Sequence, residues 1–456
     1  MIVPRTKLLF WVALVVLPFA LLAAVAPAVG WLALLLISGL LLVVIGDALV
    51  GSRRLRGLSL ELPAVVRMSK DREAKLEWRI RNPRQQKLVL RLALAWPPEI
   101  RPTDEVIEIA LPAGAEWSRL AQTCRPLRRG RYRLTLAGME TNSPLGFWGV
   151  RRQVPVQSEL RVYPNLLTER KNLAALFLNR GAFGIHAQRQ IGKGRDFEKL
   201  REYVPGDGYD EIHWKATARR GRPVTKVFQI EKTQEVYVIV DASRLSARPA
   251  MLPTPGQSPE ATAAEASSSL VLERFVTSAL ILGLAAEQQG DLFGLLTFTD
   301  RVEKFIRAKN GQAHYSACRD ALYTLQPKTA TPDFDELCTF IRLRLRRRAL
   351  LIFLTSLDDP TLAENFVRNV ELIRRQHLVL VNMIRPPGVN PLFTTPQISG
   401  MDELYQQLGG HLQWHGLREL QKVLQRRAVQ FSLLDHESLS TGLVSQYMGV
   451  KQRQLL

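Results

Sequence analysis

The sequence predicts a multidomain protein with an N-terminal transmembrane helical hairpin, a small all-β sandwich and an α/β domain of Rossmann type. Three observations predict it. The apolar run from Leu8 to Gly51 is too long for one membrane span and fits two of about 20 residues each. Alternation with a period of two then indicates half-buried strands. From Glu235 onward strands alternate with helices, which indicates a mainly parallel sheet covered on both faces.

We expect four segments along the 456 residues. Two transmembrane helices with basic flanks occupy 1–57, and a β-sandwich-like domain occupies 58–165. A signature segment and connector occupies 166–234. The α/β domain occupies 235–456 and contains a disordered insertion at about 246–267, because this stretch is rich in Ala, Pro and Ser.

The flanks of the apolar run predict its topology. Asp47 is the only charge in the run, and Pro27 and Gly30 mark the expected turn. Both flanks are basic, so both ends are predicted to be cytoplasmic. We therefore expect a multi-pass protein of the inner (plasma) membrane with cytoplasmic soluble domains. The alternative is a signal peptide cleaved near Ala26–Ala28. The basic flanking residues are Arg5, Lys7, Arg53, Arg54 and Arg56.

Composition indicates the class of partner and the compartment. The formal net charge is +20, which favours anionic partners such as phospholipid headgroups, nucleic acid or acidic protein surfaces. The three cysteines, Cys124, Cys318 and Cys338, are odd in number and lack motif spacing. This pattern argues against a disulfide framework or a zinc site and fits reduced thiols in a cytosolic compartment.

The strands of the β-sandwich are predicted from "AKLEWRIRN" and "QKLVLRLALAW", in which apolar and polar residues alternate. Turn residues separate these runs, at "NPRQ", "PAGAE", "LRRGR" and "TNSPLG". Nothing in this part of the sequence forms a catalytic constellation.

The α/β domain begins with "EVYVIVDAS", a strand of β-branched residues that ends at Asp241. A helix that stops at Gly290 and the strand "DLFGLLTFTD" follow, and "DRVEKFI" is expected as an edge strand. Two more helix–strand pairs, the helix "LRELQKVLQRR", the strand "AVQFSLL" and a closing helix complete the domain. Ligands of such folds bind at the carboxyl ends of the strands.

With Asp241 and Ser243 at the end of its first strand, the α/β domain resembles a von Willebrand factor A-like domain, a family that has a metal-ion-dependent adhesion site at this position. The resemblance implies that these residues, with Thr331 and Asp358, occupy a magnesium site, since hydroxyl and carboxylate oxygens suit this ion. Leu245 and Ser356 stand where the family commonly has ligands. We therefore expect a degenerate site with weak or absent magnesium binding, and no other cofactor. Asp241 and Ser243 would then cap loops and helix ends.

The densest stretch of the chain is "GRDFEKLREYVPGDGYDEIHWKATARRG", residues 194–221. We expect a first helix with Phe197 and Leu200 on one face, a turn, and a second short helix capped by Asp210 and ended by Gly221. Acids and bases are nearly balanced, which indicates internal ion pairs and a clamp between the β unit and the α/β domain; a docking surface is the alternative. The residues of either site are Asp196, Arg201, Tyr203, Asp207, Trp214, Lys215, Arg219 and Arg220.

Over essentially its whole length, the chain resembles a bacterial family catalogued as a domain of unknown function, numbered fifty-eight. The resemblance implies a partner of the MoxR-type AAA+ ATPase class. Asp210 departs from it, since the family usually has a basic residue there. The matching residues are Gly192, Gly194, Asp196, Phe197, Leu200, Arg201, Tyr203, Pro205, Gly206, Asp207, Ile212, Trp214, Lys215, Ala218, Arg219, Arg220, Val227 and Glu231, then "VDAS" and the ending "YMGVKQRQLL".

The expected function is non-enzymatic: a membrane-anchored adaptor or scaffold that docks a MoxR-type ATPase or a client protein in envelope processes. His186 and His213, the histidines near the signature segment, have no nucleophile at a suggestive spacing. The alternative is a basic protein that binds nucleic acid or anionic lipid. Nucleic acid is the less expected ligand, because no recognised module appears and the basic excess is diffuse.

Overall fold

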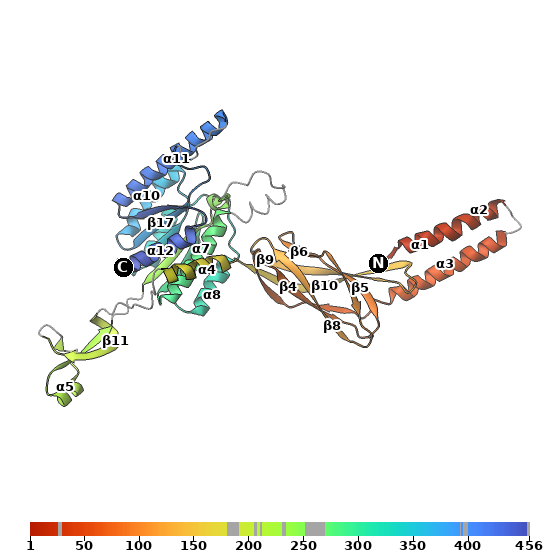
Figure 1. The fold of residues 1–456 in the computed structure, drawn as a ribbon, viewed down its shortest axis with the longest axis horizontal. Coiled ribbons are helices and arrows are strands. Elements are labelled where there is room, and N and C mark those ends of the chain that lie inside the picture. Colours follow the sequence, from red (N-terminus) through yellow and green to blue (C-terminus); the bar gives the residue numbers. More distant parts are fainter. Residues whose placement is uncertain are drawn as a thin grey trace. The chain divides into compact units, whose positions relative to one another are not determined.

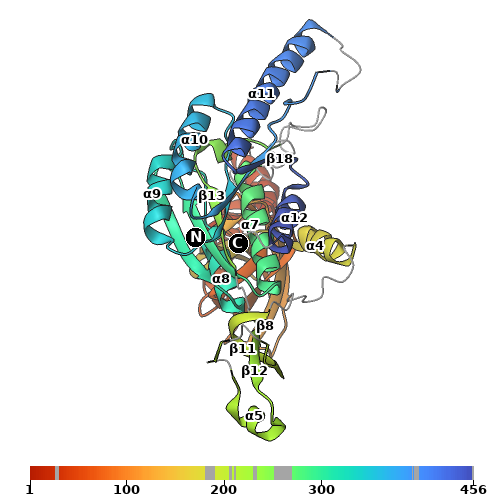
Figure 2. The same cartoon turned by 90° about the vertical axis from the view of Figure 1, so that its left-hand side faces the viewer.

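The computed structural model describes residues 1–25, 30–179, 191–204, 208–209, 212–229, 234–250, 270–392, 394 and 400–453. The chain divides into two compact units, residues 1–165 and 166–456. Figures 1 and 2 show an apolar helical segment and a β-rich region in the first unit, and an α/β region in the second.

The apolar segment contains one candidate membrane span among the described residues, where the sequence predicts two. Helix α3 (Gly30–Ser52) is long and apolar enough to cross a membrane. The preceding apolar run, Thr6–Leu21, is shorter than the roughly 20 residues that a span needs. This run packs beside α3. The helical segment that contains it continues to Val25 and consists of α1 (Thr6–Trp11), the π-helical turn η1 (Val12–Val16) and α2 (Leu17–Val25).

The beginning of the apolar segment is fixed to the β-rich region. Strand β1 (Ile2–Pro4) pairs antiparallel with β10 (Trp148–Tyr163). The Arg5 amide then donates to the Phe147 carbonyl at 2.9 Å, and the Arg5 side chain forms an ion pair with Glu140.

The end of the segment is fixed to the same region through Asp47. This carboxylate is 5% exposed and accepts hydrogen bonds from the Ser143 hydroxyl at 2.6 Å and the Leu145 amide at 2.9 Å. The indole of Trp148 donates to the Val44 carbonyl at 3.0 Å. Asp47, the single charge of the apolar run, is therefore hydrogen-bonded to the β-rich region.

The β-rich region consists of two sheets around a shared apolar core. One sheet has the order β1-β10-β9-β5-β7, with β3 also on β10, and the other has the order β2-β4-β8-β6. Alternate residues of β4 and β5 are buried, as the period-two pattern predicts. The strands are β2 (Ser59–Glu61), β3 (Val65–Ser69), β4 (Ala74–Arg81), β5 (Leu88–Leu94), β6 (Ile100–Pro102), β7 (Val106–Leu111), β8 (Trp117–Pro126) and β9 (Gly130–Asn142), with β1 and β10 as above.

The α/β region has a sheet of order β15-β14-β13-β16-β17-β18, in which β15 is the antiparallel edge strand and the other pairs are parallel. Separate apolar clusters cover its two faces, one with α7, α8 and α12 and the other with α9, α10 and α11. The elements are β13 (Glu235–Asp241), α7 (Val271–Gln288), β14 (Leu292–Phe298), β15 (Val302–Lys309), α8 (Gln312–Leu322), α9 (Phe334–Arg344), β16 (Leu350–Leu354), α10 (Pro360–Arg374), β17 (Leu378–Ile384), α11 (Met401–Arg426), β18 (Gln430–Leu434) and α12 (Leu439–Gln452).

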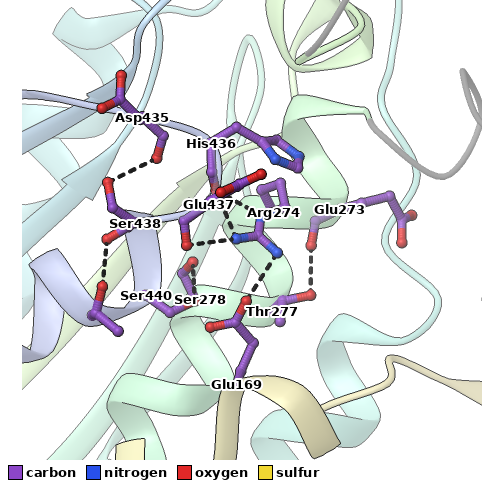
Figure 3. Close-up of polar contacts among 11 residues, drawn as sticks. Glu169, Glu273, Arg274, Thr277, Ser278, Asp435, His436, Glu437, Ser438 and Ser440 are labelled. Carbon is purple, nitrogen blue, oxygen red and sulfur yellow. Dashed lines mark hydrogen bonds and ion pairs between the residues drawn. The ribbon is translucent and has the colours of Figure 1, made fainter. Parts of the chain in front are cut away.

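Helix α4 (Leu167–Asn179), which the sequence analysis leaves within the connector, packs against α7 and α12. Arg274 of α7 forms a partly buried ion pair with Glu169 of α4 at 3.0 Å. The same guanidinium donates to the carbonyls of His436 and Glu437, which lie between β18 and α12 (Figure 3). Burial, and then the charge of Arg274, lowers the pKa of His436 to about 4. Arg274 thus joins three segments that are distant in the sequence.

The predicted disordered insertion at 246–267 is wrong at its beginning. Residues Arg244–Ala247 form a 3₁₀ turn, η4, and Ser246 and Ala250 are buried. The chain can be ordered here because the Ser246 hydroxyl donates to the Ser243 carbonyl at 2.8 Å. The rest of the insertion, 251–267, lies outside the described residues.

Candidate functional site

The first candidate site lies at the topological switch point of the α/β sheet. In the sheet, β13 lies between two strands. The next strand of the chain, β14, pairs with one of its edges, and the later strand β16 pairs with the other. Val240 lies opposite Leu354 in the parallel register, so Asp241 and Thr355 emerge together at the carboxyl ends of their strands. Open α/β sheets bind their ligands at such a point.

Asp241 is enclosed by protein donors. Its side chain is 1% exposed, one carboxylate oxygen accepts from the Ser243 amide at 2.8 Å, and the other accepts from the Thr355 hydroxyl at 2.6 Å. Burial raises the pKa of Asp241, and the hydrogen bonds from Thr355 and Ser243 act against this rise. Both carboxylate oxygens therefore have a structural hydrogen bond.

The neighbouring predicted residues also have protein partners. The Ser243 hydroxyl accepts from the Leu245 amide at 3.4 Å and caps η4. The Thr331 hydroxyl lies 3.4 Å from the Arg244 guanidinium. Asp358 forms an ion pair with Arg248, the residue that directly follows η4. The structure thus places Asp241 and Ser243 together, while Thr331 and Asp358 each contact an arginine.

The residues at this point do not fit a magnesium site. A hard cation needs about six oxygen ligands, several of them anionic. Here both oxygens of Asp241 are hydrogen-bonded, Arg248 neutralises Asp358, and the buried, apolar Leu245 occupies the third motif position. Within the part of the chain that the structure describes, no group of three or more His, Cys, Asp and Glu residues could hold a metal ion.

Magnesium is accordingly expected to bind the full chain weakly or not at all, because Arg248 already pairs with Asp358 and the apolar Leu245 occupies a ligand position of the motif. Isothermal titration calorimetry of the full chain with magnesium chloride measures this affinity. Micromolar binding that is lost in Asp241→Ala would contradict the expectation.

The second candidate site is the signature segment, which is a β-hairpin with a helix in its connection. Strand β11 (Ile191–Glu202) pairs antiparallel with β12 (Val224–Gln229), and α5 (Trp214–Arg220) lies between them in the sequence (Figure 1). The prediction of a first helix around Phe197 and Leu200 is therefore wrong. The alternating charges of this stretch suit a strand equally well, and pairing with β12 decides between the two.

The second helix is correctly predicted, but its cap is different. The His213 ring nitrogen Nδ1 accepts from the Ala216 amide at 3.0 Å, and Gly221 ends the helix in the left-handed conformation with a φ of 66°. Asp210, the expected cap, lies outside the described residues. The short helix is held to β12 because the Thr217 hydroxyl accepts from the Val224 amide at 3.0 Å.

The side chains of α5 form an exposed aromatic and basic surface. Trp214 is 69% exposed, and Lys215, Arg219 and Arg220 of the same short helix are also exposed. A clamp is expected to bury Trp214, and this side chain is exposed within its own unit. Helix α5 has no buried residue.

The other residues of the predicted clamp are placed on the hairpin itself. Arg201 and Tyr203 are half-buried, and the Tyr203 ring stacks on Tyr209 with centroids 6.3 Å apart. Asp196 lies in β11, where only its backbone is described, and Asp207 lies outside the described residues.

One ion pair of this segment, Glu202 with Arg222 at 3.1 Å, has side chains that are 67% and 73% exposed. Exposed pairs contribute little to stability, at about 0–1 kcal/mol. This pair therefore does not supply the buried ionic contact that a clamp needs.

The comparisons with known proteins support one of the sequence resemblances. Residues 199–389 match the family described as "Protein of unknown function DUF58". The match begins in β11 and ends after β17, so it includes α5 and the carboxyl-end site. It supports the family that the signature motif predicts. No curated protein matches the chain.

Solved structures give weak likenesses. A protein of unknown function from Porphyromonas gingivalis W83 is 15% identical, with a TM-score of 0.17, over 24% of this chain and 48% of its own. Proximal thread matrix protein 1 from the mussel byssus is 11% identical, with a TM-score of 0.24, over 47% of this chain and 44% of its own. The matched parts span about half of these proteins. At these values the likenesses carry no argument about fold or function.

Two residues of the carboxyl-end site were missed by the sequence reasoning. Thr355 directly precedes Ser356 in "FLTSLDD", and its position at the end of a buried strand was a usable signal. Arg248 had no such signal, because its partner Asp358 is 110 residues away.

Proposed function

We propose that the protein is a non-enzymatic adaptor, anchored by its N-terminal apolar segment, that docks a partner protein through the signature segment. The observation that carries the proposal is the exposed surface of α5, where Trp214 is 69% exposed on the same short helix as three exposed basic side chains. Tryptophan and arginine are the residue types most enriched among energetically dominant interface contacts. An exposed indole on a short helix thus has the chemistry of a docking anchor.

The partner class follows from the family resemblance. We propose a MoxR-type AAA+ ATPase, or a client protein that such an ATPase acts on. The basic residues of α5 favour an acidic surface on this partner, because complementary charges speed association and orient the two proteins.

Trp214→Ala tests the docking surface. The variant is expected to lose about 2–4 kcal/mol of binding free energy, as central interface anchors do. Its melting temperature should stay unchanged, because the side chain is mostly exposed. Pull-down from detergent-solubilised membranes followed by titration with the purified ATPase measures binding.

Trp117→Ala provides the matched control, since Trp117 is another partly exposed tryptophan, at 47%, and lies in the β-rich region. It should bind like the parent chain. A lower melting temperature of Trp214→Ala with unchanged capture of the ATPase would favour the clamp and reject the docking surface.

The alternative function is binding of anionic lipid or nucleic acid by the same basic side chains, Lys215, Arg219 and Arg220. DNA binding by the full chain that weakens steeply between low and high salt would favour it. The von Willebrand factor A-like assignment also remains a proposal, supported by Asp241 and Ser243 at the end of β13 and by the antiparallel edge strand β15.

We further propose that the apolar segment enters the membrane and returns to the same side. Its two ends are bonded to one β-rich region, through β1 on β10 and through Asp47 on Ser143. Cleavage near Ala28 would detach β1 from the sheet, so the attachment argues against a removed signal peptide. The basic flanks favour the cytoplasmic side.

A reporter fused after Leu456 is therefore expected to act as a cytoplasmic one. A fusion to green fluorescent protein reports a cytoplasmic C-terminus by its fluorescence, and a fusion to alkaline phosphatase reports the opposite side of the membrane by its activity. Phosphatase activity of this fusion, with no fluorescence, would overturn the cytoplasmic placement.

A further inference from the structure

Helix α11 carries an apolar row that the described residues of its own unit leave exposed. Met401, Tyr405 and Leu412 are 65%, 65% and 73% exposed, and Leu408 is also exposed. Their spacings of four, three and four residues place them on one face of the helix. The residues that α11 buries are Leu417 and Leu424, both in its second half. Figure 2 shows the first half of α11 extending beyond α10.

The row leads directly into a groove between α10 and α11. The groove has a volume of about 740 Å³ and includes Val367 of α10 and Gly416, Leu420 and Val423 of α11. From Leu412 the next residues on the same face are Gly416, Leu420 and Val423, at spacings of four, four and three. The exposed row and the groove are thus two parts of one continuous apolar surface.

The two ends of this surface have opposite charge. Asp402 and Glu403 lie in the first turn of α11. At the other end basic residues outnumber acidic ones: Arg368, Arg374 and Arg427 line the groove together with Glu364 and Glu371, and the exposed Lys422 pairs with Glu419. A partner helix that lies antiparallel on this surface complements its charges if the partner is acidic at its amino end and basic at its carboxyl end. Helix α11 itself has this distribution of charge.

We propose that a second copy of this chain occupies the surface, with its α11 antiparallel and Leu412 of both copies near a two-fold axis. In this arrangement Met401, Tyr405 and Leu408 of each copy fill the groove of the other at Val423, Leu420 and Gly416. The acidic first turn then lies beside the basic end of the partner helix. The contact is self-complementary and closes as a dimer.

Details of the row fit such a pair of helices. Met401 and Leu408 are seven residues apart, as are Tyr405 and Leu412, which is the spacing of a helix–helix seam. A side chain added at Gly416 would meet no atom within 4 Å, so the space over this glycine is open for a side chain of the partner copy.

Light scattering of the full chain in detergent, corrected for bound detergent, tests the proposal. The parent chain should have the mass of two copies. The double variant Tyr405→Asp with Leu412→Asp should have the mass of one copy with an unchanged melting temperature, because both side chains are exposed. Leu343→Asp, at a 70% exposed leucine of α9, should stay dimeric. A monomeric parent chain, or a double variant that remains a dimer, would overturn the proposal.

Cross-linking and charge reversal test the antiparallel direction. Leu412→Cys should form a disulfide between copies, whereas Gln425→Cys, exposed on another face of α11, should not; the native cysteines are buried. Asp402→Lys with Glu403→Lys should weaken the dimer by about tenfold, and adding Arg368→Glu with Lys422→Glu should restore it. Equal cross-linking of both cysteine variants, or no restoration, would reject the arrangement.

Discussion

Asp291→Ala is expected to destabilise the second unit by about 3–5 kcal/mol, because it removes one partner of a buried ion pair. Asp291 is 2% exposed and precedes β14. The ammonium of Lys451 lies 2.8 Å from its carboxylate, and the Tyr447 hydroxyl donates to the same oxygen. The other oxygen accepts from the Gln234 amide at 3.2 Å.

These contacts fasten the closing helix α12 to the amino ends of β13 and β14. Burial, and then the charge of Asp291, raises the pKa of Tyr447, so the phenol stays a donor. Without the carboxylate the partly buried ammonium of Lys451 keeps one neutral acceptor, the Gln289 carbonyl at 2.9 Å. An uncompensated buried charge is the source of the large expected effect.

Urea denaturation of the full chain, followed by circular dichroism, measures the loss. Adding Lys451→Met to Asp291→Ala should recover part of it, since the orphan cation is then gone. Glu419→Ala is the control, because Glu419 pairs with Lys422 on the surface, and the change should stay within about 0.5 kcal/mol. Equal losses in Asp291→Ala and Glu419→Ala would contradict the buried ion pair.

Trp78→Ala is expected to destabilise the first unit by about 3–5 kcal/mol, as deletion of a large core aromatic does. Trp78 lies in β4, is 0% exposed and packs in the core between the two sheets with Leu76 and Ile80. The cavity left behind would not be filled, because packed strands relax only partly.

Calorimetric melting of the full chain separates the two units. The transition of residues 1–165 should move to lower temperature while that of 166–456 stays in place, since each unit has its own core. Trp117→Ala, with a half-exposed indole, should change neither transition by more than about 0.5 kcal/mol. An unchanged first transition in Trp78→Ala would disprove the shared core between the sheets.

The sequence by itself determined the elements whose burial follows a local period. The alternation of β4 and the continuous apolar run of β13 predicted strands because burial on one face or on both leaves a pattern that needs no knowledge of the partner. The length and stop of α7 and the C-terminal glycine of α5 were predictable for the same reason, since caps are local.

The tertiary structure alone decided the features that depend on distant partners. Asp47 meets Ser143, Asp358 meets Arg248 and Glu169 meets Arg274, each about a hundred residues apart in the chain. β11 is a strand because β12 supplies its hydrogen bonds, although its sequence also fits a helix. Trp214 is exposed and α11 leaves an apolar row uncovered because no other element of the described chain packs there. A local pattern specifies which side chains avoid water, whereas the fold specifies what covers them.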